Sequence, residues 1–374
     1  MMKVLIDDEA FIIQKYGGVS RIFSEILSRL VNCKNTQLLF YNFYSENEYL
    51  NALGFNGISP YLKNLNFPLK GKIIRFISRF FSNPFTIKNI KSANADIFHS
   101  SFYSDYYLNS LQNNSKIKFV FTIHDLIHEL MPEVKGNADL AANKKNNLLR
   151  ADHIIVVSES TKKDLLKFYP FVDKNKITVI HLANSLTNES EKVINLPEKY
   201  LLFVGERRGY KNFNLFIEAF NAFSLIHPDY KVVCTGSMSF SSSEIHLFKK
   251  LNLQQKIFHF KCNDKQMRYI YEKSKMFVFP SLYEGFGLPV LEAFACKTPV
   301  ILSNSSSLPE VGDTAALYFN PQSEIELTNK MLLLANDQNL CNELVEKGIN
   351  RLNDFSWDKH FESTYSIYKS LHYK

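Results

Sequence analysis

Cysteines are few in this sequence, and long apolar runs are missing from it. The 374 residues include 5 cysteines, and no two of them form a Cys-x-x-Cys pair or a zinc-ligand spacing. Apolar runs are short, as at Phe277 to Phe279 and Val300 to Leu302, so we expect no membrane-spanning helix. The first residues lack the apolar stretch of a signal peptide. These absences predict reduced thiols and a soluble protein of the cytoplasm.

The sequence also lacks the motifs of two kinds of site, a protein-bound metal and the cofactor site of a nicotinamide dehydrogenase. The sequence has no Asp-x-Asp and no His, Cys and carboxylate cluster with ligand spacing, so we expect no protein-bound metal. It has no Gly-x-Gly-x-x-Gly followed by a ribose-binding acid, which disfavours a nicotinamide dehydrogenase. The remaining composition, 45% hydrophobic and 22% charged, excludes a disordered, collagen-like or disulfide-stapled chain. The length predicts two domains.

Acidic residues are missing from one long stretch of a chain whose formal net charge is +7. None occurs between Glu48 and Asp96. Within this stretch, residues 68–81 (PLKGKIIRFISRFF) have helical periodicity. One face of the expected helix carries Leu69, Ile73, Phe76, Ile77 and Phe80, and the opposite face carries Lys72, Arg75 and Arg79.

Two interpretations of this basic amphipathic helix remain open. The helix packs its apolar face on its own domain, or it lies in an anionic membrane surface. Nucleic-acid binding is a weaker third interpretation, because the charge forms one patch and no reader motif accompanies it.

Strand-like and helix-like stretches alternate along the chain, which predicts an α/β fold with doubly wound parallel sheets. The polar stretch Thr187 to Glu198 is the best linker candidate. Ligands of such sheets bind at the carboxyl ends of the strands. The expected strands are Lys3 to Ile6, Ile97 to Phe98, Lys118 to Ile123, His153 to Val157, Tyr200 to Val204, Lys231 to Thr235, Ile257 to Phe260, Met276 to Phe279 and Pro299 to Leu302.

The most informative segment runs from Phe277 to Pro321. A strand ends there at Pro280, a glycine-rich turn follows, and a helix begins near Leu288 or Pro289. The amide groups and dipole at such a helix start suit an anion or a ring of sugar hydroxyls. Glu284 and Glu292 flank this start and could reach two points of one extended ligand. The alternative is an ordinary strand-to-helix turn with two solvated acids.

Three weaker signals stand at other expected strand ends. Arg207, Arg208 and Lys211 follow one strand, and cations there suit a diphosphate, although an exposed basic loop is the alternative. Gly17 and Gly18 follow the first strand, where backbone without Cβ can approach a phosphate. His124 and His99 end two further strands, and each is a candidate site residue or a packed histidine.

Together these motifs resemble the retaining glycosyltransferases of family 4, which have the GT-B fold. The family's EGFGLPxxEA stretch, with its Glu-x7-Glu pattern, is matched from Glu284 to Ala293. The phosphate loop resembles the form VGxRxxYKNF of a mannosyltransferase-like branch that builds O-antigen or capsule polysaccharides, matched from Val204 to Phe213. Gly17 to Arg21 and the stretch HDLIHELMPE are similar to that branch's acceptor domain. Phe355 to Trp357 resembles the family's ending.

The resemblance implies an α/β, GT-B fold with two Rossmann-like doubly wound domains facing across a cleft. Residues 1–190 would form the acceptor-binding domain and residues 191–355 the nucleotide-sugar domain. Residues 356–374 would form a helix that crosses back to the first domain.

The resemblance also implies a role for each matched residue. Glu292 would bind the ribose hydroxyls, and His124 would lie at the reacting centre. Relatives often have Arg where this chain has Tyr210, which favours Arg207 over Arg208 as the phosphate cation. The donor sugar would be held by Glu284 and the amides of Gly285, Phe286, Gly287 and Leu288, and the diphosphate by Arg207 and Lys211 with Gly17 and Gly18 closing from the other domain.

The implied reaction moves a hexose, such as mannose, from a nucleotide-diphosphate sugar to a lipid-linked or growing cell-surface saccharide, with retention and without a metal or other cofactor. A GDP-linked donor follows from the branch name alone. A lipid-linked acceptor would bring the enzyme to the inner face of the cytoplasmic membrane, where residues 68–81 would bind anionic lipid. The alternatives are a GT-B phosphorylase or epimerase, and an inactive paralogue that binds a membrane or a partner.

Overall fold

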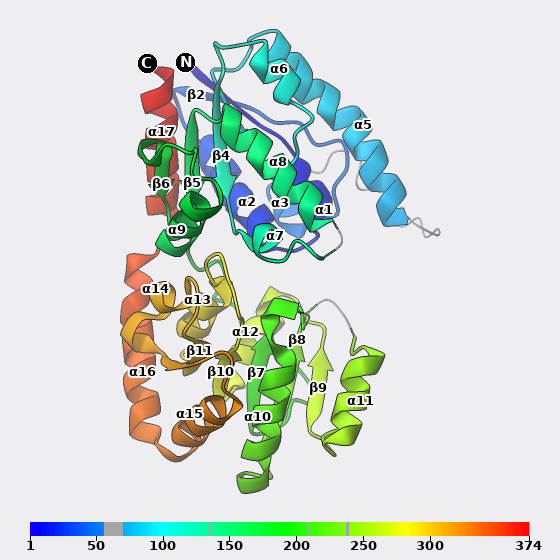
Figure 1. Cartoon of the computed structure of the whole chain (residues 1–374), viewed down its shortest axis with the longest axis vertical. Coiled ribbons are helices and arrows are strands. Elements are labelled where there is room, and N and C mark those ends of the chain that lie inside the picture. The colour runs from blue at the N-terminus through cyan, green and yellow to red at the C-terminus, as the bar shows by residue number, and fades with distance from the viewer. Residues whose placement is uncertain (56–69, 135, 208, 237–238, 374) are drawn as a thin grey trace. The chain divides into compact units, whose positions relative to one another are not determined.

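The computed structural model describes residues 1–55, 70–134, 136–207, 209–236 and 239–373 (Figure 1). Pro68 and Leu69 of the expected basic helix and the candidate cation Arg208 lie outside these residues. The chain divides into two compact units. The first contains Met1–Leu182 and Trp357–Lys374, and the second contains Ala183–Ser356.

The first unit is built on a six-stranded parallel sheet with the order β2-β1-β3-β4-β5-β6. Its central strands are buried on both faces, so they read as apolar runs rather than as an alternating pattern. The strands are β1 (Met2–Ile6), β2 (Thr36–Leu39), β3 (Ile97–Ser100), β4 (Lys118–Ile123), β5 (His153–Val156) and β6 (Ile177–Val179).

The second unit is built on another six-stranded parallel sheet, with the order β12-β11-β10-β7-β8-β9. The α/β class with two doubly wound sheets, expected from the sequence, is confirmed. The strands are β7 (Tyr200–Val204), β8 (Lys231–Thr235), β9 (Ile257–Phe260), β10 (Met276–Phe279), β11 (Val300–Ser303) and β12 (Leu317–Phe319).

Each sheet contains a point at which the strand order reverses. In the first sheet the reversal lies between β1 and β3, and in the second it lies between β7 and β10. Right-handed crossovers on the two sides of a reversal place their helices on opposite faces of the sheet. The loops that follow the two central strands therefore diverge, and ligands of open α/β sheets bind between them.

Helices surround both sheets (Figure 1). Those of the first unit are α1 (Glu9–Ile13), α2 (Gly18–Leu30), α3 (Glu48–Ala52), α5 (Lys70–Lys91), α6 (Leu108–Gln112), α7 (Ile127–Leu130), α8 (Asn137–Arg150), α9 (Glu159–Phe168) and α17 (Trp357–His372). Those of the second unit are α10 (Phe213–Ile226), α11 (Ser242–Lys250), α12 (Asp264–Lys273), α13 (Leu288–Ala295), α14 (Leu308–Gly312), α15 (Glu324–Asn336) and α16 (Gln338–Arg351).

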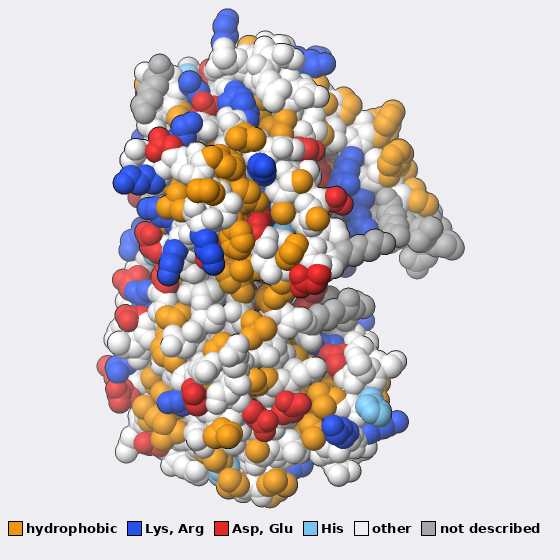
Figure 2. All heavy atoms as spheres, viewed as in Figure 1, with side chains coloured by type: hydrophobic (Ala, Val, Ile, Leu, Met, Phe, Trp, Pro, Cys, Tyr) orange, Lys and Arg blue, Asp and Glu red, His pale blue; other side chains and the backbone are white. Residues whose placement is uncertain are grey.

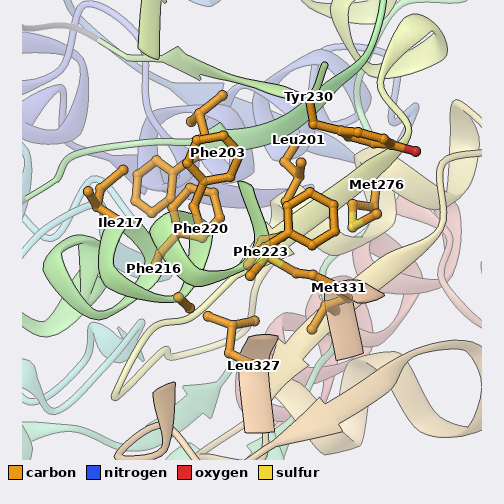
Figure 3. Close-up of a cluster of buried hydrophobic side chains, with 14 of the residues drawn as sticks. Leu201, Phe203, Phe216, Ile217, Phe220, Phe223, Tyr230, Met276, Leu327 and Met331 are labelled. Atoms are coloured by element: carbon orange, nitrogen blue, oxygen red, sulfur yellow. The ribbon is translucent and has the colours of Figure 1, made fainter. Parts of the chain in front are cut away.

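Helix α10 supplies much of the core of the second unit. Its sequence FNLFIEAFNAFSLI places Phe216, Phe220 and Phe223 on one face at helical spacing, and all three are fully buried. Figure 3 shows these rings beside Leu201 and Phe203 of β7. Burial of a phenylalanine side chain stabilises the folded state by roughly 1.5–3 kcal/mol. This aromatic layer fixes the position of β7 and of the loop that follows it.

The first half of helix α5 carries apolar side chains that are exposed to solvent. Ile73, Phe76, Ile77 and Phe80 are all exposed, with Phe76 72% and Phe80 67% accessible. Figure 2 shows apolar side chains along the outer edge of this helix. The interpretation in which this apolar face packs on its own domain is therefore wrong. Within the described residues, no helix combines the length and the apolar character needed to cross a bilayer.

The inner side of α5 is polar around residues 78–82. Ser78 and Ser82 are buried, and the Ser82 hydroxyl donates a hydrogen bond to the Asp8 carboxylate at 2.7 Å. The Arg79 guanidinium forms an ion pair with the buried carboxylate of Glu9. Buried carboxylates require such partners, because removing their hydration costs several kcal/mol. These polar contacts attach the middle of α5, and apolar contacts add to them, since the Phe81 ring stacks on that of Phe43 with centroids 4.2 Å apart and Ile90 is fully buried.

Candidate functional site

The reversal point of the second sheet carries a close ion pair. Lys211 ends the turn Gly209–Lys211 after β7, and Glu284 lies in the loop after β10. The Lys211 ammonium lies 2.6 Å from the Glu284 carboxylate, and both side chains are largely buried. The sequence predicted both residues as ligands of one donor, and the structure brings them together.

Serine side chains hold the loop that carries Glu284. The Ser306 hydroxyl oxygen accepts a hydrogen bond from the Glu284 N–H at 2.8 Å. The Ser307 hydroxyl lies 2.9 Å from the Glu284 carbonyl oxygen and 2.8 Å from the Phe286 carbonyl oxygen. Sequence reasoning missed these supports, although three consecutive serines after an expected strand, Ser305 to Ser307, were a usable signal.

The glycine-rich turn ends at the start of α13. Gly287 has φ +112°, in the left-handed region, and an added Cβ would lie 2.9 Å from Leu308 Cδ2. Leu288 is the first residue of the helix, and a proline follows in the first turn. Phe286 is buried, with its ring 5.8 Å from that of Phe355. The amides from Gly285 to Leu288 therefore lie at a well-fixed helix N-terminus beside Glu284.

Glu292 lies on α13. The Tyr271 hydroxyl of α12 donates a hydrogen bond to its carboxylate at 3.1 Å. Burial and the Glu292 charge raise the pKa of Tyr271 well above its ordinary value, so the phenol stays protonated and remains a donor. Tyr271 therefore fixes one oxygen of the carboxylate that the family resemblance predicts to bind ribose.

Arg207 does not share the partner of Lys211 but contacts residues at the start of α11 and just before it. Its Nε donates to the Glu244 carboxylate at 2.7 Å, and its Nη2 donates to the Ser239 carbonyl oxygen at 3.0 Å. The guanidinium also lies 4.8 Å from the Phe240 ring centroid. Glu244 itself closes the capping box at the start of α11. The structure thus pairs Arg207 with α11, and its role as a diphosphate ligand stays a prediction.

The two candidate glycines of the first unit, Gly17 and Gly18, begin α2. Gly17 is the N-cap residue and Gly18 the first residue of the helix. Gly17 has an extended backbone, and a Cβ there would collide with the Gln14 side chain. Gln14 accepts a hydrogen bond from the Ser20 N–H at 2.9 Å. Glycine at position 17 therefore permits this side chain to close the start of α2.

His124 follows β4 directly and is 7% exposed. Neither of its ring nitrogens has a hydrogen-bond partner among the described residues. Burial lowers the pKa of His124 to about 4, so the ring is neutral near pH 7 and offers one donor and one acceptor nitrogen. A buried imidazole without partners costs free energy, and such a cost is typical of functional residues.

His99 is a structural residue. It is fully buried at β3, and its Nδ1 lies 2.5 Å from the Tyr368 hydroxyl of α17. Its Nε2 lies 2.7 Å from the Thr122 hydroxyl of β4. With both nitrogens engaged, His99 joins α17 to the first sheet.

No group of three or more His, Cys, Asp or Glu side chains in the part of the chain that the structure describes is arranged to hold a metal ion.

Comparisons with known proteins match both halves of the chain. The family described as Glycosyltransferase Family 4 matches residues 16–183, and that described as Glycosyl transferases group 1 matches residues 185–351. The chain belongs to the family 4 glycosyltransferases. The expectation drawn from the glycine-rich and basic motifs is therefore confirmed at the level of family, GT-B fold and enzyme class.

Two curated relatives of this glycosyltransferase are mannosyltransferases. An O-antigen chain mannosyltransferase B of Escherichia coli is 24% identical over 67% of this chain and 70% of its own length. The O-antigen chain mannosyltransferase RfbU of Salmonella typhimurium is 33% identical over 48% of this chain and 50% of its own length. The match thus spans about half of the second relative.

A solved structure shares the fold of this glycosyltransferase over nearly the whole chain. Anabaena HepE in complex with UDP-glucose superposes with a TM-score of 0.73, at 14% sequence identity, over 99% of this chain and 100% of that one.

Proposed function

We propose that this glycosyltransferase moves a hexose, with mannose as the first candidate, from a nucleotide-diphosphate sugar to a growing cell-surface saccharide. The observation that carries the proposal is the Lys211 and Glu284 pair at the reversal point of the second sheet. A cation and an acceptor carboxylate side by side, next to the N-terminus of α13, suit a ligand that joins a phosphate to a sugar.

The proposed chemistry uses fixed charges in place of a metal ion. Cleavage of the anomeric C–O bond builds negative charge on the departing diphosphate and positive character on the sugar. Lys211 and the amides at the start of α13 would stabilise the phosphate charge as it develops. Retention would follow from attack on the face that the phosphate leaves, with a phosphate oxygen accepting the proton of the acceptor hydroxyl.

Glu284, Glu292 and His124 would hold the donor. Glu284 would accept hydrogen bonds from sugar hydroxyls while Lys211 turns its ammonium to the phosphate. Glu292, fixed by Tyr271, would bind the ribose hydroxyls. A ring nitrogen of His124 would form a hydrogen bond with a sugar hydroxyl. The donor would thus supply a partner that this nitrogen lacks among the described residues.

A donor panel tests this proposal. Thermal shift and calorimetry are run with GDP-mannose, UDP-glucose and the free nucleotides, with and without EDTA. One donor is expected to raise the melting temperature of the wild type, since binding stabilises the native state by mass action. Glu292→Ala should lose that shift, whereas the matched Glu343→Ala, which changes a surface acid paired with Lys347, should keep it. If no nucleotide or nucleotide sugar binds, the proposal is wrong.

We further propose that the acceptor is lipid-linked and that α5 lies in an anionic membrane surface. The support is that Phe76 and Phe80 are exposed, whereas Ser78 and Ser82 of the same helix are buried. An aromatic and apolar face next to a stretch without acidic residues has the character of an interfacial helix.

Sedimentation with vesicles of phosphatidylglycerol and phosphatidylcholine tests the membrane proposal. The double variant Phe76→Ser/Phe80→Ser should lose binding at least 10-fold, because two phenylalanine rings no longer enter the lipid. The control Leu225→Ser/Ile226→Ser removes two apolar side chains that are 79% and 62% exposed on α10. If both double variants bind as the wild type does, α5 is not the contact.

A further inference from the structure

The loop that carries His124 rests on a buried tyrosine hydroxyl. Tyr103 follows β3, and only 1% of it is exposed. Its hydroxyl oxygen accepts hydrogen bonds from the His124 N–H at 2.8 Å and from the Asp125 N–H at 3.3 Å. Two successive backbone amides thus share one acceptor, which defines the direction in which the chain leaves β4.

The Tyr103 ring also contacts the imidazole. The centroids of the Tyr103 and His124 rings are 5.8 Å apart, and the Phe23 ring lies 6.3 Å from the imidazole at a near-perpendicular angle. Aromatic contacts of this kind restrict the rotamers available to the histidine. The imidazole is thereby positioned by packing, while its nitrogens have no partner among the described residues.

Lys144 also holds the loop that carries His124, through hydrogen bonds to residues 125 and 129. It is 0% exposed on α8, and its ammonium donates to the Asp125 carbonyl oxygen at 3.0 Å and to the Glu129 carboxylate at 2.7 Å. The ammonium also lies 4.6 Å from the Tyr103 ring centroid. The Tyr169 hydroxyl donates to the second oxygen of Glu129 at 2.6 Å. A fully buried lysine is rare and requires such complete pairing.

We infer that Tyr103 and Lys144 are positioning residues for His124, a role that rests on the proposed function of His124 at the reacting centre. Tyr103 sets the backbone of His124 and packs against its ring. Lys144 ties residues 125 and 129 together across the same turn and packs on Tyr103. Together they hold an unpartnered imidazole in one orientation before the substrate arrives.

The test compares Tyr103→Phe with Tyr107→Phe. The first substitution leaves the ring and removes the acceptor of the two amides. The second removes a hydroxyl that is equally buried in the same unit, 2.7 Å from Ser100 Oγ and 2.9 Å from Asn147 Oδ1. With a donor identified by the panel, Tyr103→Phe should lower kcat by about 10- to 100-fold, since displacing a reacting group by 1 Å costs about that much. Tyr107→Phe should keep the wild-type kcat and donor KM.

A double-mutant cycle separates positioning from general destabilisation. Tyr103→Phe should have no further effect on kcat in the His124→Ala background, because it acts only through the imidazole. Additive losses would overturn the inference, as would a wild-type kcat for Tyr103→Phe. If Tyr103→Phe does not fold, Lys144→Met is put through the same cycle, with the same outcomes deciding.

The inference and the proposed function fail in different ways. A wild type that transfers no sugar from any donor contradicts the proposed function. A wild type that is active, is inactivated by His124→Ala and is indifferent to Tyr103→Phe contradicts the inference alone.

Discussion

The Lys211 ammonium lies 2.6 Å from the Glu284 carboxylate, although the two residues follow different strands, β7 and β10. Strands β7 and β10 are parallel neighbours, so their carboxyl ends lie side by side at the same end of the sheet. The pair therefore depends on the order of the strands rather than on closeness in sequence.

Loss of either partner should damage transfer. Lys211→Met should lower kcat/KM by about 100-fold, because it removes a charge aimed at the developing phosphate. Lys211→Arg should recover part of this loss. The control is Lys199→Met, which removes a lysine paired with Asp229 at the same 2.6 Å but at the surface. Initial rates with the identified donor decide, and equal rates for Lys211→Met and Lys199→Met would exclude Lys211 from the site.

The ion pair between Arg79 and Glu9 should contribute to the attachment of α5. Arg79→Met leaves the buried Glu9 carboxylate without its cation and should destabilise the protein by about 1–3 kcal/mol, a range reduced for the half-exposed arginine. Adding Glu9→Gln should restore part of the stability, because no buried charge then remains unpaired. Urea unfolding of the single and double variants measures this, and a double variant less stable than Arg79→Met would contradict the explanation.

Asp7 should make the protein less stable as the pH rises. Burial raises the pKa of Asp7 to about 7 from 3.8, and its Oδ2 has no hydrogen-bond partner among the described residues. The folded state then binds more protons than the unfolded state between pH 4 and 7, so stability falls across that window as the pH increases. Asp7→Asn should remove this loss and be more stable than the wild type at pH 8, by an amount on the order of 2–4 kcal/mol.

Thermal melts at pH 5 and pH 8 check the prediction for Asp7. The stability gap between Asp7→Asn and the wild type should widen at pH 8. Asp229→Asn, at the surface beside Lys199, should show no such widening. A gap that is equal at both pH values would mean that Asp7 is ionised in the folded protein without cost.

His99 should have the opposite effect on the acid side. Burial lowers the pKa of His99 to about 3 from 6.5, so the folded state holds the ring neutral while the unfolded state binds a proton. The resulting stability is present above pH 6.5 and is lost as the pH falls toward 3. Replacing this histidine by glutamine should flatten the acid limb of the stability profile. If the slope of the stability profile at low pH is unchanged in this variant, groups other than His99 cause the loss of stability there.

The sequence predicts every central strand and one edge strand, β9, but misses the other three edge strands. The runs expected for β4, β7, β8, β9 and β10 agree with the structure residue for residue. The strands it misses are β2, β6 and β12, and each lies at the edge of a sheet. They have three or four residues and are buried only in part, so neither an apolar run nor a clear alternation marks them.

Sequence patterns locate the candidate site but leave side-chain pairing open. The spacing of Lys211 and Glu284 from their strands places both at one sheet edge. No local pattern shows that Arg207 pairs with Glu244, because the partner comes from another strand-to-helix connection. For α5 the periodicity defines two faces without indicating which is inward, because the partners that orient the helix, such as Glu9 and Asp8, lie outside it.

The bond between Tyr368 and His99 joins positions 269 residues apart, and the whole second unit is encoded between them. During synthesis, every residue of the second unit is therefore made before α17. Until α17 is made, the Tyr368 hydroxyl is not available to the first sheet, and Nδ1 of His99 lacks this hydrogen-bond partner. The unit whose synthesis begins first thus cannot be completed until the whole of the other unit has been synthesised, because it needs the helix that follows its neighbour.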